Sequence, residues 1–153
     1  MNKIGIIGAG VMGTDLAQMT AEAGFSIKLY DNSSKKVKDA LSTIESRLRK
    51  YEKKQRITAA ERERIISHIK IVDDITEFSD SDILLEAVYE DLSVKKGVFA
   101  MLDKTCSPAS VLASITSSIS ITEIASATAR PESVIGLHFL NPARVMPLVE
   151  IVP

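Results

Sequence analysis

Short apolar runs alternate along the chain with longer stretches in which apolar residues recur at helical spacing. This alternation is typical of a parallel sheet covered by helices on both faces, because a strand buried on both faces has little need of polar residues. The pattern predicts strands over residues 4–7, 27–30, 69–72, 83–85, 111–113, 134–137 and 148–152. It predicts helices over residues 13–23, 34–55, 59–67, 94–102 and 121–127. We therefore expect an α/β fold with a mainly parallel sheet.

The second and third predicted strands are joined by an extra helical pair, which is more than a crossover needs. The pair carries a basic cluster, defined by Arg47, Arg49, Lys50, Lys53, Lys54 and Arg56. On composition alone, such a cluster is more often a solvated helix face than a binding site.

Composition narrows the function classes. A length of 153 residues suits one domain with a sizeable core. A formal net charge of −1 gives no general reason to expect nucleic-acid or membrane binding, and no apolar run is long enough to span a bilayer. The lone cysteine, Cys106, excludes an internal disulfide and suits a reducing cytoplasm, where we expect the protein to reside.

The first chemical motif is the glycine-rich stretch between the first predicted strand and the first predicted helix. It consists of Gly8, Ala9, Gly10, Val11, Met12 and Gly13, and it matches the pattern GxGxxG. In this context the first glycine permits a tight turn, the second lets the backbone approach a pyrophosphate, and the third lets helix and strand pack closely. The N–H groups at the start of the helix then face the phosphate charge. The motif predicts a dinucleotide-binding fold of the Rossmann type.

Asp31 ends the second predicted strand, 18 positions after Gly13. An acid at this place accepts hydrogen bonds from the adenosine ribose and repels a 2′-phosphate, which favours NAD over NADP. Taken alone, an aspartate there is equally well explained as a turn or capping residue.

Further polar residues follow the predicted strands where ligands of open α/β sheets bind. These residues are Glu86, Glu90, Ser114, Thr116, Ser117, Ser118, His138 and Asn141. Each one alone has a plain structural explanation as a turn, cap or packing residue. Glu150 is different, because it lies inside an apolar run that we expect to be a buried strand, and a buried carboxylate needs a partner. His138, at a neighbouring strand end, is a plausible partner, and the two would form a general base with a fixed tautomer.

These motifs together resemble the 3-hydroxyacyl-CoA dehydrogenase family, including bacterial 3-hydroxybutyryl-CoA dehydrogenases. The resemblance rests on GAGVMG, DILLEAVYEDLSVKKGVF, LASITSSISITEIAS and GLHFLNPARVMPLVE, and it continues through KKQRITAAERERIISHI. It covers essentially the whole chain. It implies that residues 1–153 are the NAD-binding Rossmann domain and that the family's C-terminal helical domain, through which full-length members dimerise, is absent here.

The resemblance also implies a reaction and residue roles. The reaction is the reversible oxidation of (S)-3-hydroxyacyl-CoA by NAD, with His138 as general base, Glu150 as the acid that orients it, and Ser117 bonded to the substrate oxygen beside the cofactor. The expected NAD contacts are the glycine turn (Gly8 to Gly13), Asp31, Glu90, Lys95, Ser117 and Asn141. The expected CoA contacts are Lys54, Arg47 and Ser117. No metal is expected.

The sequence departs from the family at several positions. Ile115 replaces an asparagine in the motif SNTSS, which removes an amide next to Ser117. Arg47 stands where the family has a serine, and its guanidinium could still bind phosphate. Arg144 and Pro147 replace residues that are usually valine or proline and lysine. The ending MPLVEIVP is reminiscent of related dehydrogenases of free 3-hydroxy acids, so two alternatives remain beside the acyl-CoA reaction: oxidation of a free acid, and an NAD-binding domain that does not turn over alone.

Overall fold

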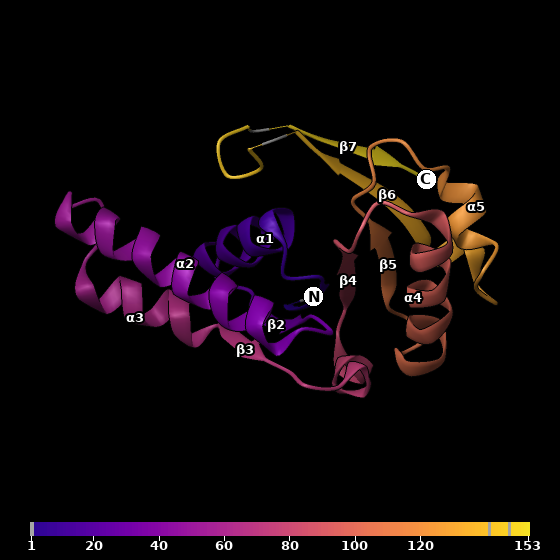
Figure 1. The fold of residues 1–153 in the computed structure, drawn as a ribbon, viewed down its shortest axis with the longest axis horizontal. Helices are drawn as coiled ribbons and strands as arrows, with labels where there is room; N and C mark the ends of the chain where they lie inside the picture. Colours follow the sequence, from indigo (N-terminus) through magenta and orange to yellow (C-terminus); the bar gives the residue numbers. More distant parts are fainter. Residues whose placement is uncertain (1, 141, 147) are drawn as a thin grey trace.

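The computed structural model describes residues 2–140, 142–146 and 148–153, and its strands form one seven-stranded sheet (Figure 1). The strands are β1 (Lys3–Ile7), β2 (Ser26–Tyr30), β3 (Ile69–Ile71), β4 (Ile83–Glu86), β5 (Val111–Ser114), β6 (Val134–Phe139) and β7 (Val149–Val152). The α-helices are α1 (Val11–Glu22), α2 (Ser34–Lys53), α3 (Ala59–Ser67), α4 (Leu92–Thr105) and α5 (Ile121–Ala125). Two 3₁₀ helices, η1 (Ile75–Asp80) and η2 (Pro131–Ser133), precede β4 and β6.

The strand order is β3-β2-β1-β4-β5-β6-β7. All neighbouring pairs are parallel except β6 and β7, which are antiparallel. The chain leaves β1 toward β2 on one side and later returns to add β4 on the other, so the strand order reverses between β1 and β4. This doubly wound arrangement is the Rossmann fold predicted from the glycine motif, and ligands of such sheets bind above the carboxyl ends at the reversal.

Helices cover the two faces of the sheet separately (Figure 1). Residues of α1, α2 and α3, such as Leu16, Ile44 and Ile65, pack with Ile6 and Leu29 in one buried cluster. Residues of α4, α5 and η1 form the second cluster on the opposite face with Leu84, Leu112 and Val134. The split follows from the period of two along a strand, since alternate side chains enter opposite layers.

Cys106 is the C-cap residue that follows α4, and it belongs to the second cluster. Its side chain is buried, and burial raises the pKa of its thiol to about 11 although nearby Arg130 acts in the opposite direction.

The extra helical pair predicted from the sequence is present as α2 and α3, which lie side by side and extend away from the sheet (Figure 1). A side-chain cap begins each helix. Ser33 accepts the Lys36 N–H at the start of α2, and Thr58 and Glu61 form a complete capping box at the start of α3. Only four residues of α2 are buried in the core, so most of its surface is exposed to solvent. These residues are Val37, Ala40, Ile44 and Leu48.

β7 corrects one expectation from the sequence. The strand is present, but all four of its residues are exposed, Glu150 included. β7 is the last strand of the sheet and is bonded on one side to β6 alone. Large apolar side chains therefore remain uncovered on it and on the preceding loop, with Val145 72%, Leu148 51% and Ile151 68% exposed. The apolar sequence that suggested a buried strand instead forms an open apolar edge.

Candidate cofactor and catalytic site

The glycine turn has a geometry that other residues could not adopt. Gly8 has φ +104°, and a Cβ atom there would lie 2.4 Å from the carbonyl oxygen of Ala87. A Cβ atom on Gly13 would lie 1.8 Å from the carbonyl oxygen of Gly8. These contacts fix β1, α1 and the loop after β4 against one another. Gly10 differs, because a Cβ atom there would meet nothing within 4 Å. The space over Gly10 is therefore open to a ligand.

A cavity of about 730 Å³ lies over this turn. Its lining includes Gly8, Gly10, Val11, Met12, Tyr30, Asp31, Glu90, Lys95, Ile115 and Ser117. Gly10 caps α1 without a side-chain hydrogen bond, which leaves the N-terminal N–H groups of the helix to an incoming phosphate. The volume, the open space over Gly10 and the free helix end all suit a dinucleotide. The same cavity thus gathers predicted NAD residues from α4 and from the loops that follow β1, β2, β4 and β5.

Asp31 serves the protein as well as the cavity. Its Oδ2 accepts the Ala9 N–H at 2.9 Å, and its Oδ1 accepts the Ser33 N–H at 2.9 Å. The carboxylate thereby ties the glycine turn to the end of β2. A carboxylate has about four acceptor positions, so two remain for ribose hydroxyls. The capping explanation and the cofactor explanation for Asp31 are therefore compatible.

A buried ion pair lies beside the cavity. Lys95 Nζ donates to Glu86 Oε1 at 2.7 Å and to Oε2 at 3.0 Å, and these side chains are 1% and 0% exposed. Glu86 also accepts from Ser114 Oγ at 2.6 Å and from the Val88 N–H at 2.8 Å. These four hydrogen bonds offset the cost of burying the charge of the carboxylate.

Glu90 extends this ion pair toward the cavity. Lys95 Nζ is 3.2 Å from Glu90 Oε2, and Thr116 and Ser118 donate their hydroxyls to Glu90 Oε1. Burial raises the pKa of the Glu90 carboxyl, but the hydrogen bonds from Thr116 and Lys95 outweigh it, so the pKa lies below its usual value. We call Glu86, Lys95 and Glu90 the ionic cluster.

Ser117 is exposed and lines the cavity. The turn that carries it is held by Thr116 Oγ1, which accepts the N–H groups of Ser118 and Ile119 at 3.3 and 3.0 Å. Ile115 lines the cavity and packs against the first core cluster. The polar network of this turn therefore runs through Thr116 and Glu90.

His138 and Glu150 are in contact, as the sequence suggested. They face each other across β6 and β7, and His138 Nδ1 lies 2.7 Å from Glu150 Oε2. Their side chains are 29% and 60% exposed, so the pair is open to solvent and the expected burial of Glu150 is wrong. Neither residue is among the described residues that line the cavity. Asn141, the remaining predicted NAD contact, lies outside the described residues.

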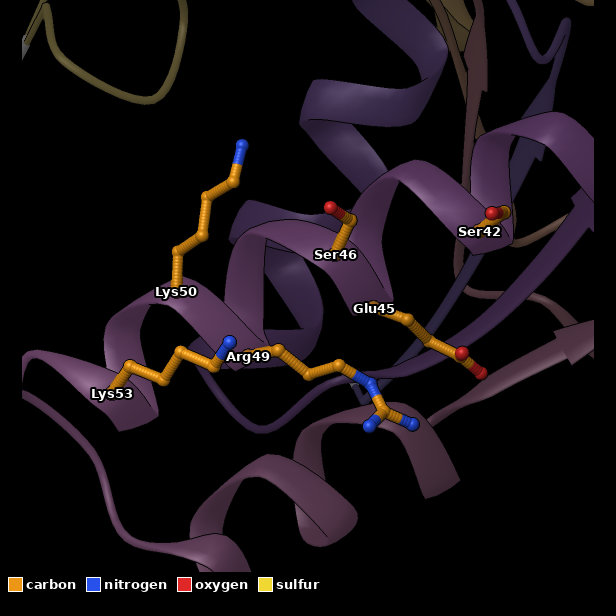
Figure 2. A pocket seen from close by; sticks show the side chains of 6 residues that line it. All are labelled: Ser42, Glu45, Ser46, Arg49, Lys50 and Lys53. Atoms are coloured by element: carbon orange, nitrogen blue, oxygen red, sulfur yellow. The ribbon is translucent and has the colours of Figure 1, made fainter.

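The basic cluster is divided between faces of α2. Arg49, Lys50 and Lys53 border an open hollow of about 310 Å³ together with Ser42, Glu45 and Ser46 (Figure 2). Arg47 lies on another face, where its guanidinium is 2.7 Å from the buried carboxylate of Asp15. Lys54 caps the end of α2 and is exposed. Arg47 therefore has a structural partner that its sequence context did not indicate.

Arg144 makes a contact that the sequence did not reveal. It donates a hydrogen bond to the Tyr51 hydroxyl, and its guanidinium lies 5.9 Å from the centre of the Tyr51 ring. Arg56 lies 6.0 Å from the same ring centre. The contact joins the loop between β6 and β7 to the end of α2, across 93 positions of sequence. Neither the distance along the chain nor the residue types gave a signal for it.

These features define an NAD-binding Rossmann domain. The family profile described as the 3-hydroxyacyl-CoA dehydrogenase NAD binding domain matches residues 3–153. The chain therefore belongs to the 3-hydroxyacyl-CoA dehydrogenase family, and its cofactor is NAD. Within the part of the chain that the structure describes, no helix has the length and apolar character to cross a bilayer.

Individual relatives agree with this assignment. The chain is 40% identical over 152 residues to a probable 3-hydroxybutyryl-CoA dehydrogenase of Bacillus subtilis (strain 168). The aligned region covers 99% of this chain and 53% of that protein. A solved 3-hydroxybutyryl-CoA dehydrogenase from Escherichia coli K12 has a TM-score of 0.95 at 41% identity, covering 98% of this chain and 32% of that one. The (S)-3-hydroxybutyryl-CoA dehydrogenase from Ralstonia eutropha has a TM-score of 0.95 at 35% identity, covering 99% and 53%. The chain thus spans about half the length of two of these relatives and about a third of the E. coli chain.

Proposed function

We propose that the protein oxidises (S)-3-hydroxyacyl-CoA substrates, such as 3-hydroxybutyryl-CoA, with NAD. The observation that carries the proposal is the His138–Glu150 pair, held by facing positions of β6 and β7 in a domain whose cavity suits a dinucleotide. Family membership supports it, as do the relatives named for 3-hydroxybutyryl-CoA. The reducing environment that suits the lone Cys106 makes the cytoplasm the proposed location.

His138 is proposed to take the proton of the 3-hydroxyl group. Because Nδ1 is bonded to Glu150, Nε2 is the nitrogen left to face the substrate. Glu150 fixes the ring orientation and stabilises the imidazolium that forms. The glycine turn and Asp31 would hold NAD⁺, which would supply a hydride acceptor for C3, so that the products would be 3-oxoacyl-CoA and NADH. Ser117, exposed in the cavity, is proposed to donate its hydroxyl to the substrate oxygen. Asn141 is proposed as an NAD contact on the family match alone.

The CoA moiety is proposed to bind at the end of α2, where Lys54 is exposed. Arg47 shares that side of the helix, since positions seven apart recur on one face. Lys50, four positions before Lys54, also borders the hollow, so it lies between the two faces. Arg47 is already paired with Asp15, so we assign it the smaller part.

The test is the oxidation of NADH by acetoacetyl-CoA in a protein that turns over. We expect His138→Ala to lower kcat by about 10²–10⁴-fold, the usual value of general acid–base catalysis, with NADH binding nearly unchanged. Glu150→Gln should also lower the rate. His68→Ala, which changes the other histidine at the end of α3, is the matched control and should retain full activity. A loss below about tenfold in His138→Ala would contradict the assignment.

A second candidate function is an NAD-binding domain that does not turn over alone. It is favoured by the solvent exposure of His138 and Glu150, because water weakens the electrostatic stabilisation of a reaction. NADH binding without turnover of acetoacetyl-CoA would identify it. Turnover of free acetoacetate in preference to acetoacetyl-CoA would instead identify a dehydrogenase of free 3-hydroxy acids.

A further inference from the structure

The ionic cluster lies on the side of the glycine turn where the redox-active end of the cofactor belongs. Asp31, at the end of β2, is placed for the adenosine ribose. β4 and β5 lie on the opposite side of β1 from β2, so the other half of the dinucleotide falls over their carboxyl ends. Glu86 ends β4, and Glu90 and Lys95 line the cavity just beyond it.

The cluster holds two carboxylates and one ammonium group, so it carries a net charge of −1. Glu86 and Lys95 are almost fully buried, and solvent screens their charges poorly. The other charged residues that line the cavity in the described part of the chain, Asp31 and Lys36, lie at the end of β2 and the start of α2, on the adenosine side. One uncompensated negative charge is therefore fixed near the redox end of the cavity.

We propose that the ionic cluster tunes the redox state of the bound cofactor. The nicotinamide ring of NAD⁺ is positively charged and that of NADH is neutral, so a net negative charge beside the ring stabilises the oxidised form relative to the reduced form. Glu86 acts beneath the cavity, through Lys95, and is a positioning and charge-setting residue without contact to the ligand. The inference requires only that the chain binds NAD, and it stands separately from the acyl-CoA reaction.

The experiment measures the dissociation constants of NAD⁺ and NADH by calorimetric titration and compares their ratio, Kd(NAD⁺)/Kd(NADH). Glu86→Gln changes the cluster charge from −1 to zero and should raise the ratio by about tenfold, the order expected for a unit charge within ~10 Å at an effective dielectric constant of ~20. Glu90→Gln removes the same charge at an exposed position. It should raise the ratio similarly, and it decides the matter if the buried variant fails to fold. Lys95→Gln changes the charge to −2 and should lower the ratio.

The double variant Glu86→Gln/Lys95→Gln separates charge from scaffolding. It removes the buried ion pair but leaves the net charge at −1, so the ratio should return to within about threefold of the unmodified protein. Glu132→Gln is the control for a distant charge and should leave the ratio unchanged. Glu132 lies in η2, just before β6, and therefore at the amino ends of the parallel strands, opposite the carboxyl ends that border the cavity. If both dissociation constants change by the same factor in each of the three single variants, their ratio stays constant and the cluster is only a scaffold. A double variant whose ratio differs from that of the unmodified protein as much as the ratios of the single variants do would show that the ratio depends on the ion pair and not on the net charge. That result would also overturn the proposal. Absence of binding by either cofactor form would overturn it together with the NAD assignment.

Discussion

Single residues in this domain carry more than one function, and Asp31 is the clearest case. Its two carboxylate oxygens hold the Ala9 and Ser33 N–H groups, which fixes the glycine turn against β2. The same negative charge lies where a 2′-phosphate would have to fit. Discrimination between the two nicotinamide cofactors is therefore built from a residue that the turn also needs.

We expect the protein to bind NADH at least about tenfold more tightly than NADPH, the factor that corresponds to ~1.4 kcal/mol of repulsion. Asp31→Ser keeps a hydroxyl acceptor for the turn, removes the charge, and should narrow the difference. Parallel titrations with both cofactors measure it, with Asp39→Asn on the exposed face of α2 as the charge control. Equal affinities in the unmodified protein would refute this role of Asp31.

Two glycines should respond oppositely to the same substitution. Gly13→Ala places a methyl group against the backbone oxygen of Gly8 and should lower the free energy of unfolding by about 1–3 kcal/mol or more, besides weakening NADH binding. Gly97→Ala, in the middle of α4, meets nothing within 4 Å and should raise the free energy of unfolding by about 0.5–1 kcal/mol. Urea denaturation followed by circular dichroism compares them. An unchanged midpoint for Gly13→Ala would mean that the turn is less tightly packed than its geometry indicates.

At the scale of elements, α2 presents different cations on different faces. Lys54 lies at its end, three positions after Tyr51, which meets Arg144 from the loop between β6 and β7. Arg49 lies over the open hollow on another face (Figure 2). Replacing Lys54 or Arg49 by glutamate changes the net charge of the protein by the same amount, but the two substitutions alter different surfaces.

We expect Lys54→Glu to raise the KM for acetoacetyl-CoA several-fold and to leave the KM for NADH nearly unchanged. The effect should shrink as salt is added, because exposed charges are screened within ~8–10 Å at physiological ionic strength. Arg49→Glu is the matched control and should leave both constants nearly unchanged. If the two variants behave alike, the basic cluster is a solvated helix surface.

The elements differ in how well the sequence foretold them. The residues of α3 were predicted to their ends, because the Thr58–Glu61 capping box marks its start clearly. The direction and exposure of β7 were not predictable, since its apolar run is the same whether a strand lies inside the sheet or at its edge. The short helices η1 and η2 have too few residues to show a period.

The contacts of the site follow the same rule. The approach of His138 to Glu150 could be suggested because both residues end or occupy strands of one sheet. The contacts of Glu86 with Lys95 and of Tyr51 with Arg144 depend on how loops and helices pack, which local pattern does not encode.

At the scale of the whole molecule, the open apolar edge at β7 lies next to the proposed base. We expect a protein of these 153 residues alone to fold and bind NADH, but to turn over acetoacetyl-CoA far below the usual 1–10³ s⁻¹, because the His138–Glu150 pair is open to solvent. Its sedimentation should show a largely monomeric protein or self-association through the apolar edge. Ile151→Lys, on exposed β7, should suppress self-association if that edge is responsible. A normal turnover number would show that this domain suffices for catalysis.

The chemical labelling of the buried Cys106 can be used to measure transient unfolding of the protein. The thiolate is the form of cysteine that attacks alkylating reagents. A thiol with a pKa of about 11 inside the second core cluster is almost entirely protonated at pH 8. Labelling by iodoacetamide should therefore proceed through transient unfolding, at a rate set by the population of open molecules. Because NADH binds only the folded protein, labelling should slow about 100-fold at a free NADH concentration 100 times its Kd. Equal labelling rates for the native and the urea-unfolded protein would contradict this. If labelling slows as expected, the labelling rate of Cys106, followed by mass spectrometry, reports the affinity of a bound ligand. The measurement does not require the ligand to absorb light, and it uses a thiol far from the glycine turn in sequence.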